Sequence, residues 1–192
     1  MTTLSQSDAQ FLADHSRHDP DFFWQSILGC TSVYTKQLEM ARAVRDHNRV
    51  AVVGANGTGK DWQSARVMLW WMATRSPAIC VVLGPTHRQV SDIVWKEARS
   101  AYLTARMPLG GQMYRTARWE YDDRRYAVGF STDNEYNIQG FHSPNLLVIL
   151  TEAHNIEQSH IDAVKRLNPA RMLLTGNAFA SSGEFYEAFH GG

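Results

Sequence analysis

Apolar residues in this chain gather in short continuous runs that predict strands, and the run 145–150 is typical of a strand buried on both faces. The runs cover residues 49–53, 78–83, 145–150 and 171–175. The segments between them have the apolar content or spacing of helices, and they cover residues 61–72, 87–105 and about 157–167. Because strands and helices alternate, the pattern predicts an α/β fold with a mostly parallel sheet covered by helices on both faces.

Four polar residues separate two further β-rich segments and predict a β-hairpin. Residues 113–121 and 126–132 flank Asp122–Arg125, which has the composition of a turn. We expect this hairpin to be inserted between the elements of the core. Residues 35–46 have helical spacing and lead directly into the first strand.

The length of the chain sets its domain organisation. Its 192 residues can form one substantial core but leave little room for a second full domain. We expect residues 1–33 to form an N-terminal helical cap, in which Asp19 precedes a helix that begins at Pro20. Residues 34–192 then form the core domain.

Charge and cysteine content narrow the possible partners. Lys plus Arg and Asp plus Glu number 19 each, so the formal charge is zero and gives no global attraction to nucleic acid or membranes. Any contact with nucleic acid is therefore expected to be local. With two cysteines, no signal peptide and no apolar span of membrane length, the sequence predicts a soluble protein of a reducing cytoplasm.

A glycine-rich segment after the first strand has the spacing of a nucleotide phosphate-binding loop, G-x4-G-K. Glycines in such a loop let the backbone N–H groups turn toward a phosphate, and the lysine adds positive charge. A glycine-rich turn with an incidental lysine is the alternative, but the preceding strand and the following helix favour the loop. The predicted nucleotide-binding residues are Gly54, Ala55, Asn56, Gly57, Thr58, Gly59, Lys60 and Asp61.

Two positions depart from the usual pattern of such sites. Asp61 stands where a Ser or Thr normally places its hydroxyl on Mg²⁺, and Thr151 stands where an acidic metal ligand is expected at the end of strand 145–150. We hypothesise a reciprocal exchange that keeps one carboxylate and one hydroxyl for the metal. The alternative is that Thr151 weakens metal binding, so that the site holds nucleotide without turning it over.

Two more strand ends carry candidate chemistry. Glu152 is placed to orient an attacking water and accept its proton, although it would also serve as a helix cap. Thr175, Gly176 and Asn177 end the next strand, where an amide can bond a terminal phosphate or simply form a turn. Because ligands of parallel sheets bind at the carboxyl ends of strands, we expect these motifs to meet at one edge.

These motifs together resemble the ATPase domain of tailed-phage terminase large subunits, the DNA-packaging motor proteins. The resemblance covers most of the chain. The matching segments are Tyr34-x-x-Gln37, Gly54–Lys60, Gly84-Pro85-Thr86-x-x-Gln89-Val90, Trp95-x-Glu97, Gln139–His142, Glu152-Ala153, Thr175–Asn177 and Gly183–Phe189. The last segment is the most specific to the family, since other P-loop proteins have no reason to carry it.

The resemblance implies a P-loop NTPase fold of the RecA/ASCE-like type and an ATPase that uses ATP and Mg²⁺. It implies that Gln37 contacts adenine, Lys60 the β- and γ-phosphates and Glu152 the hydrolytic water. Thr175, Gly176 and Asn177 would couple phosphate release to motion. The implied partners are double-stranded DNA, the portal of a procapsid, the terminase small subunit and further copies in a ring, in the host cytoplasm and without a membrane.

Two features depart from the family. Relatives often have an arginine finger at the position of Gln139, which leaves Arg88 and Arg99 as substitutes. Whole large subunits continue into an RNase H-like nuclease, so we expect no nuclease activity from this chain.

Two other functions fit part of the sequence. A helicase-like P-loop ATPase shares the motifs at 37, 54–60 and 151–154, but needs a second RecA-like domain. A nucleotide-binding module with little hydrolysis would explain Thr151 and the missing arginine.

The predicted hairpin also mixes cations with aromatic residues, as DNA-contacting surfaces do. Its candidate DNA-binding residues are Arg115, Arg118, Arg124 and Arg125. The neutral overall charge favours the alternative of a solvated hairpin with cross-strand packing.

Overall fold

The computed structural model describes residues 6–132, 138, 140–179 and 182–190, and its centre is a seven-stranded sheet. The strands are β1 (Arg49–Val53), β2 (Ala78–Gly84), β3 (Gln112–Met113), β4 (Arg118–Asp122), β5 (Arg125–Ser131), β6 (Leu146–Leu150) and β7 (Arg171–Gly176). Their order across the sheet is β1-β7-β6-β2-β5-β4-β3. The five strands from β1 to β5 in this order pair in parallel, which confirms the predicted α/β fold.

The hairpin forms as expected from β4 and β5, but its second strand also belongs to the parallel part of the sheet. β5 pairs in parallel with β2 from Ala78 opposite Arg125 to Gly84 opposite Ser131. β4 pairs with β5, and β3 with β4, in antiparallel fashion. The hairpin therefore lies between core elements in the chain, as expected, and also extends the main sheet.

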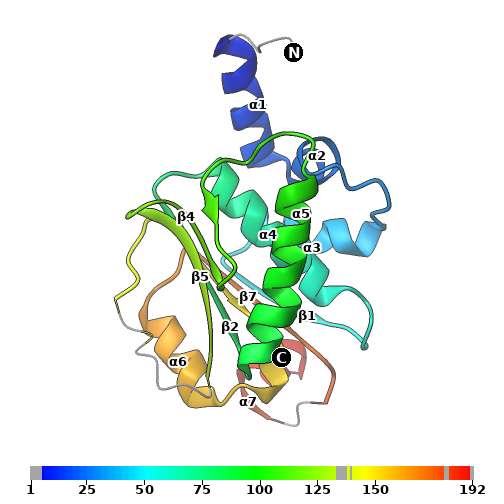
Figure 1. Ribbon diagram of the computed structural model, residues 1–192. Helices are drawn as coiled ribbons and strands as arrows, with labels where there is room; N and C mark the ends of the chain where they lie inside the picture. The colour runs from blue at the N-terminus through cyan, green and yellow to red at the C-terminus, as the bar shows by residue number, and fades with distance from the viewer. Residues whose placement is uncertain (1–5, 133–137, 139, 180–181, 191–192) are drawn as a thin grey trace.

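Helices cover both faces of the sheet (Figure 1). α3 (Thr35–Asp46), α4 (Lys60–Thr74) and α5 (Trp95–Thr104) pack on one face, whereas α6 (Gln158–Arg166) and α7 (Gly183–His190) pack on the other. Alternation along β2 divides its side chains between the two cores: Val82 faces α4, and Val81 and Leu83 face the side of α6. Both faces of the central strands β2 and β6 are buried, so these strands read as continuous apolar runs. The strand β1 lies at the edge of the sheet and is only partly buried.

The helix predicted over 87–105 has two parts. Its first turns form a π-helical segment, η2 (Gln89–Val94), and α5 continues from it. A π-helical turn accommodates one more residue than an α-turn and is frequent at functional sites. Gln89 is the first residue of this segment.

The N-terminal segment packs on the same core as α4. It consists of α1 (Gln6–His18), α2 (Pro20–Phe22) and η1 (Phe23–Ile27), and the Asp19 carboxylate accepts a hydrogen bond from the N–H of Phe22 at 3.0 Å, as a helix cap does. Trp24 is fully buried, and Trp70 Nε1 of α4 donates to the Ser16 carbonyl at 2.7 Å. A short helical turn, η3 (Ala153–Asn155), follows β6. Within the described residues, none of the helices has the length and apolar character needed to span a membrane.

Candidate functional site at the carboxyl ends of the strands

The glycine-rich loop, residues 54–59, connects the end of β1 to the start of α4. Gly57 and Gly59 adopt positive φ angles of 78° and 79°, a backbone conformation that favours glycine. Gly59 is the N-cap of α4 and offers no side chain to the first N–H groups of the helix. Uncapped N–H groups at a helix N-terminus form a binding site for anions, so this end of α4 fits a phosphate.

Lys60 joins this loop to the end of β7. Its ammonium nitrogen Nζ donates to the carbonyls of Gly54 at 2.9 Å and Ala55 at 3.0 Å, and to Asn177 Oδ1 at 2.7 Å. The Asn177 amide in turn donates to Asn56 Oδ1 at 2.8 Å. The structure therefore brings the predicted phosphate-binding lysine and the predicted coupling asparagine into direct contact.

The two residues that depart from the usual pattern also meet. Thr151 is fully buried, and its hydroxyl donates a hydrogen bond of 2.7 Å to Asp61 Oδ1. The side-chain amide of Gln89 donates to the same Asp61 oxygen at 2.9 Å and to Thr151 Oγ1 at 3.1 Å. Sequence reasoning gave Gln89 no role, although its position after β2 lies within one of the matching segments.

These oxygens fit a magnesium ion by their chemistry. A carboxylate and a hydroxyl are hard ligands of the kind that Mg²⁺ binds, with waters and phosphate oxygens completing its octahedron. Among the residues that the structure describes, no group of three or more His, Cys, Asp or Glu side chains gathers to form a closed metal cage. Asp61 and Thr151 thus suit a metal that is shared with a ligand.

Glu152 occupies a strained position directly after β6. Its backbone is left-handed, with φ 51° and ψ 43°, which is uncommon for a residue with a side chain and costs of order 1–3 kcal/mol. Such strain tends to persist at functional sites. The carboxylate oxygen Oε2 lies 3.4 Å from His154 Nδ1 and remains partly open to solvent.

His154 connects Glu152 to the end of β7. Its Nδ1 atom accepts a hydrogen bond of 3.2 Å from the backbone N–H of Asn177. The close approach of the His154 ring to the end of β7 requires glycine at position 176. A Cβ atom there would lie 3.0 Å from both His154 Nδ1 and the Phe185 ring. Glycine in the predicted coupling motif is thus explained by packing. Thr175 of the same motif is fully buried in β7.

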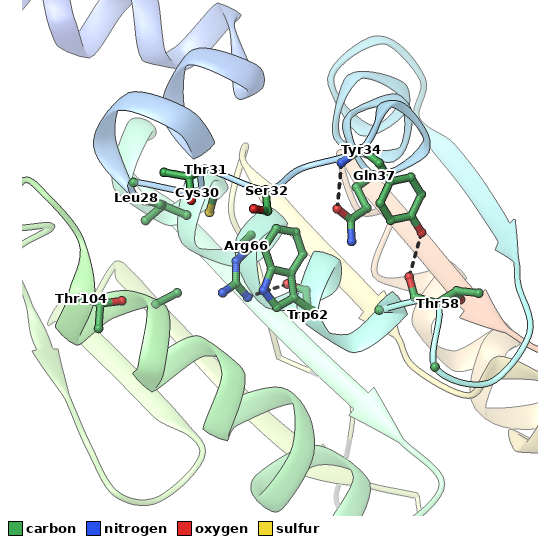
Figure 2. A pocket seen from close by; sticks show the side chains of 14 residues that line it. Leu28, Cys30, Thr31, Ser32, Tyr34, Gln37, Thr58, Trp62, Arg66 and Thr104 are labelled. Atoms are coloured by element: carbon green, nitrogen blue, oxygen red, sulfur yellow. Dashed lines mark hydrogen bonds between the residues drawn. The ribbon is translucent and has the colours of Figure 1, made fainter.

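A cavity of about 560 Å³ opens beside the glycine-rich loop (Figure 2). Tyr34 donates from its hydroxyl to the Thr58 carbonyl at 3.0 Å, and Gln37 Oε1 accepts from the Tyr34 N–H at 3.3 Å. Figure 2 shows Trp62 and Arg66 between the chain segment 28–32 and the loop, with the Arg66 guanidinium 3.7 Å from the centre of the Trp62 ring. The cavity therefore has an aromatic wall and polar groups next to the predicted phosphate site.

The four candidate DNA-binding arginines differ in position and surroundings. Arg118 and Arg125 lie toward opposite ends of the hairpin, because Arg118 is opposite Val128 and Asp122 is opposite Arg125. Arg125 donates to the carbonyls of Met72 and Ala73 and lies 3.8 Å from the Tyr121 ring centre, so its guanidinium holds the hairpin to α4.

The other three arginines differ in their surroundings. Arg118 pairs with Glu120 at 2.7 Å, and Arg124 is exposed. Of the substitutes for the arginine finger, Arg99 donates to the carbonyl of Arg115, and Arg88 is exposed before η2. Gln139 lies outside the described residues.

Comparisons with known proteins identify the fold. No family model matches the sequence, and no curated protein matches it. Solved structures do match. The large terminase ATPase domain of Thermus phage P74-26 has a TM-score of 0.62 and 19% identity over 89% of this chain and 74% of that chain. The HK97 bacteriophage large terminase has a TM-score of 0.61 and 15% identity over 88% of this chain and 38% of that chain.

A third match is the large terminase of a thermophilic bacteriophage solved in complex with ADP. Its TM-score is 0.56 at 16% identity, over 76% of this chain and 38% of that chain. At such identities the likeness concerns the fold, and the resemblance expected from the sequence is confirmed at that level. The chain has the fold of phage large-terminase ATPase domains.

Proposed function

We propose that this chain is the ATP-hydrolysing motor domain of a phage terminase large subunit and drives double-stranded DNA into a procapsid. The observation that carries the proposal is the meeting of four residues at the carboxyl ends of the strands. Lys60 contacts Asn177, and Asn177 contacts His154 beside Glu152. The fold shared with large-terminase ATPase domains, and the ADP complex among the matching structures, support the same conclusion.

The glycine-rich loop would bind the phosphates of ATP. Lys60 Nζ donates to two loop carbonyls and to Asn177 Oδ1, and phosphate oxygens are stronger acceptors for an ammonium group than these. ATP binding would thus redirect Lys60 and change the contact between the loop and Asn177. This exchange gives Asn177 a physical means to report whether the terminal phosphate is present.

The base of ATP would occupy the cavity beside the loop. Gln37 and Tyr34 lie on its wall next to Thr58, and Trp62 provides an aromatic surface. A pocket with an apolar wall and a few placed polar groups is the usual form of a small-molecule site.

Glu152 would act as the general base in hydrolysis. Its carboxylate is partly open to solvent, so it can receive a water molecule and accept the water's proton as the γ-phosphoryl group is transferred. Asp61 and Thr151 would hold Mg²⁺, which when bound neutralises charge on the phosphate oxygens. Asp61 belongs to the first turn of α4, so the same helix end would serve metal and phosphates.

The wider setting follows from the same proposal. Residues 1–33 would be a helical cap on an ATPase core formed by residues 34–192. The motor would act in the host cytoplasm as a ring of copies on the procapsid portal, together with the terminase small subunit. Duplex DNA would be held through its phosphates without reading of sequence.

Steady-state ATP hydrolysis tests the proposal. We expect Mg²⁺-dependent turnover that is abolished by Lys60→Ala and by Glu152→Gln. Hydrolysis that survives both substitutions would reject this site as its origin.

A further inference from the structure

Gln89 closes a triangle of hydrogen bonds with Asp61 and Thr151. Its Nε2 atom donates to Asp61 Oδ1 at 2.9 Å and to Thr151 Oγ1 at 3.1 Å, while the Thr151 hydroxyl donates to the same Asp61 oxygen at 2.7 Å. The three residues come from the first turn of α4, the first turn of η2 and the position that follows β6. One neutral amide therefore ties together three separate elements.

The chain after β2 is built to deliver this amide. A Cβ atom at Gly84 would lie 3.0 Å from Thr151 Cγ2, 3.4 Å from Gln89 Cγ and 2.9 Å from Val90 Cγ2. Glycine at this position therefore avoids a clash with Val90 and a tight contact with Thr151. The N–H of Gln89 also bonds to Thr86 Oγ1 at 3.2 Å, which fixes the start of η2.

The hydrogen bonds of the triangle do not use every acceptor of Thr151 and Asp61. The Thr151 hydroxyl donates its one hydrogen bond to Asp61 and accepts one from Gln89. One lone pair of the hydroxyl oxygen therefore has no hydrogen-bond donor in the triangle. Asp61 Oδ1 accepts twice, whereas none of the described residues donates a hydrogen bond to Asp61 Oδ2. A lone pair on the hydroxyl and a carboxylate oxygen are thus both available as ligands.

We propose that Gln89 is a positioning residue for the cation site, because its amide fixes the Thr151 hydroxyl and the Asp61 carboxylate in the orientation that presents these two free ligands. The inference rests on the proposed function of Asp61 and Thr151 as the protein ligands of Mg²⁺. A neutral donor suits this role, since a Glu at position 89 would place a second carboxylate against Asp61. A Leu would leave Thr151 Oγ1 without a donor and Asp61 Oδ1 with the Thr151 hydroxyl alone. Groups that orient metal ligands in this way are typically worth about 10–100-fold in metal affinity.

Manganese binding tests the role of Gln89 independently of turnover. Mn²⁺ replaces Mg²⁺ as an oxygen-seeking probe, and its free form is measured by electron paramagnetic resonance during titration of the protein with ADP present. We expect Gln89→Met, which keeps the length of the side chain, to weaken Mn²⁺ binding by about 10–100-fold. ADP binding in the presence of EDTA should stay unchanged, because the loop is untouched.

Ser91→Ala is the matched control, since the Ser91 hydroxyl lies in the same π-helical segment and, among the described residues, forms its hydrogen bond with the His87 ring. It should bind Mn²⁺ as the unmodified chain does. If Gln89→Met does not fold, as judged by its unfolding temperature, Gln89→Asn serves instead, because its shorter amide cannot span the same distances.

The outcomes separate this inference from the proposed function. Unchanged Mn²⁺ affinity in Gln89→Met, together with lost binding in Asp61→Ala, would overturn the role of Gln89 and leave the cation site standing. Equal Mn²⁺ binding by Asp61→Ala and the unmodified chain would overturn both.

Discussion

The Thr151 hydroxyl donates a hydrogen bond of 2.7 Å to the Asp61 carboxylate, although the two residues lie 90 positions apart in the sequence. This contact joins the end of β6 to the first turn of α4, and each partner has the side chain that is usual at the other position. A hydroxyl and a carboxylate that touch can exchange places with little change in the set of oxygens around a cation.

The contact predicts how substitutions at the two positions combine. Thr151→Asp alone should abolish Mg²⁺-dependent hydrolysis, because two carboxylates would then face each other at hydrogen-bond distance. The double substitution Asp61→Ser with Thr151→Asp should restore much of it. Rates of the two single variants and the double variant, measured as a double-mutant cycle, give the coupling between the positions. Purely additive losses would show that the exchange is not reciprocal.

We expect His154 to affect turnover through its Nδ1 atom, which lies next to both Asn177 and Glu152. Its Nδ1 accepts from the Asn177 N–H at 3.2 Å and lies 3.4 Å from Glu152 Oε2. His154→Ala would leave that N–H without an acceptor, which costs roughly 1–3 kcal/mol, and would remove the ring that lies beside the Glu152 carboxylate. We expect a lower kcat with little change in KM.

The matched control is His154→Asn, whose side-chain oxygen can take the place of Nδ1 as the acceptor. It should recover most of the kcat and the stability that His154→Ala loses. If both variants behave alike, the acceptor at this position has no role in turnover.

Cys30 reports on the cavity beside the glycine-rich loop. This residue is partly exposed and lines the cavity, whereas Cys80 is fully buried in β2 and its pKa is raised by burial. A thiol reagent should therefore label Cys30 first, and saturating ADP should slow the labelling by covering the thiol. Mass spectrometry of labelled peptides measures both sites. Labelling of Cys30 at the same rate with and without bound ADP would place the base elsewhere.

Arg124 and Arg125 are neighbours in sequence but should differ in their effect on stability. Arg125 donates to the carbonyls of Met72 and Ala73, so Arg125→Ala should lower the free energy of unfolding by roughly 1–3 kcal/mol. Arg124 is exposed, and Arg124→Ala should change the free energy of unfolding by no more than about 0.5 kcal/mol. Urea denaturation of both variants measures the difference, and equal effects would contradict the assigned role of Arg125.

The same pair also tests DNA contact by the hairpin. Since the Arg125 guanidinium is engaged within the fold, Arg124→Ala is the cleaner probe of phosphate binding. Salt-sensitive binding to duplex DNA that is unchanged in this variant and in Arg115→Ala would remove the hairpin from the proposed DNA surface.

Elements with a strong local pattern could be predicted from the sequence. The apolar runs became β1, β2, β6 and β7, although β1 is an edge strand and only partly buried. The glycine-rich loop connects strand and helix, as its glycines require. The predicted site residues meet at one edge of the sheet, because parallel strands bring their carboxyl ends together. These residues are Lys60, Asp61, Thr151 and Asn177.

Features that depend on distant partners could not be predicted. The hairpin pattern is local and contains no information that β5 would pair in parallel with β2. The contacts of Gln89 with Asp61 and of His154 with Asn177 join segments that are distant in sequence, so they became visible only in the structure. Arg125 resembled a surface cation because its partners are backbone carbonyls of α4, which leave no trace in side-chain composition.

The measurement that tests the central claim most directly is steady-state ATP hydrolysis with Mg²⁺ at high protein concentration. It compares the unmodified chain with Lys60→Ala and with Glu152→Gln, and ADP binding is measured in parallel for each variant. The account predicts turnover that both substitutions abolish, with a loss of at least about 100-fold for Glu152→Gln, while Glu152→Gln still binds ADP. ADP binding that depends on Lys60 without any turnover by the unmodified chain would contradict it, and the chain would then be a nucleotide-binding module.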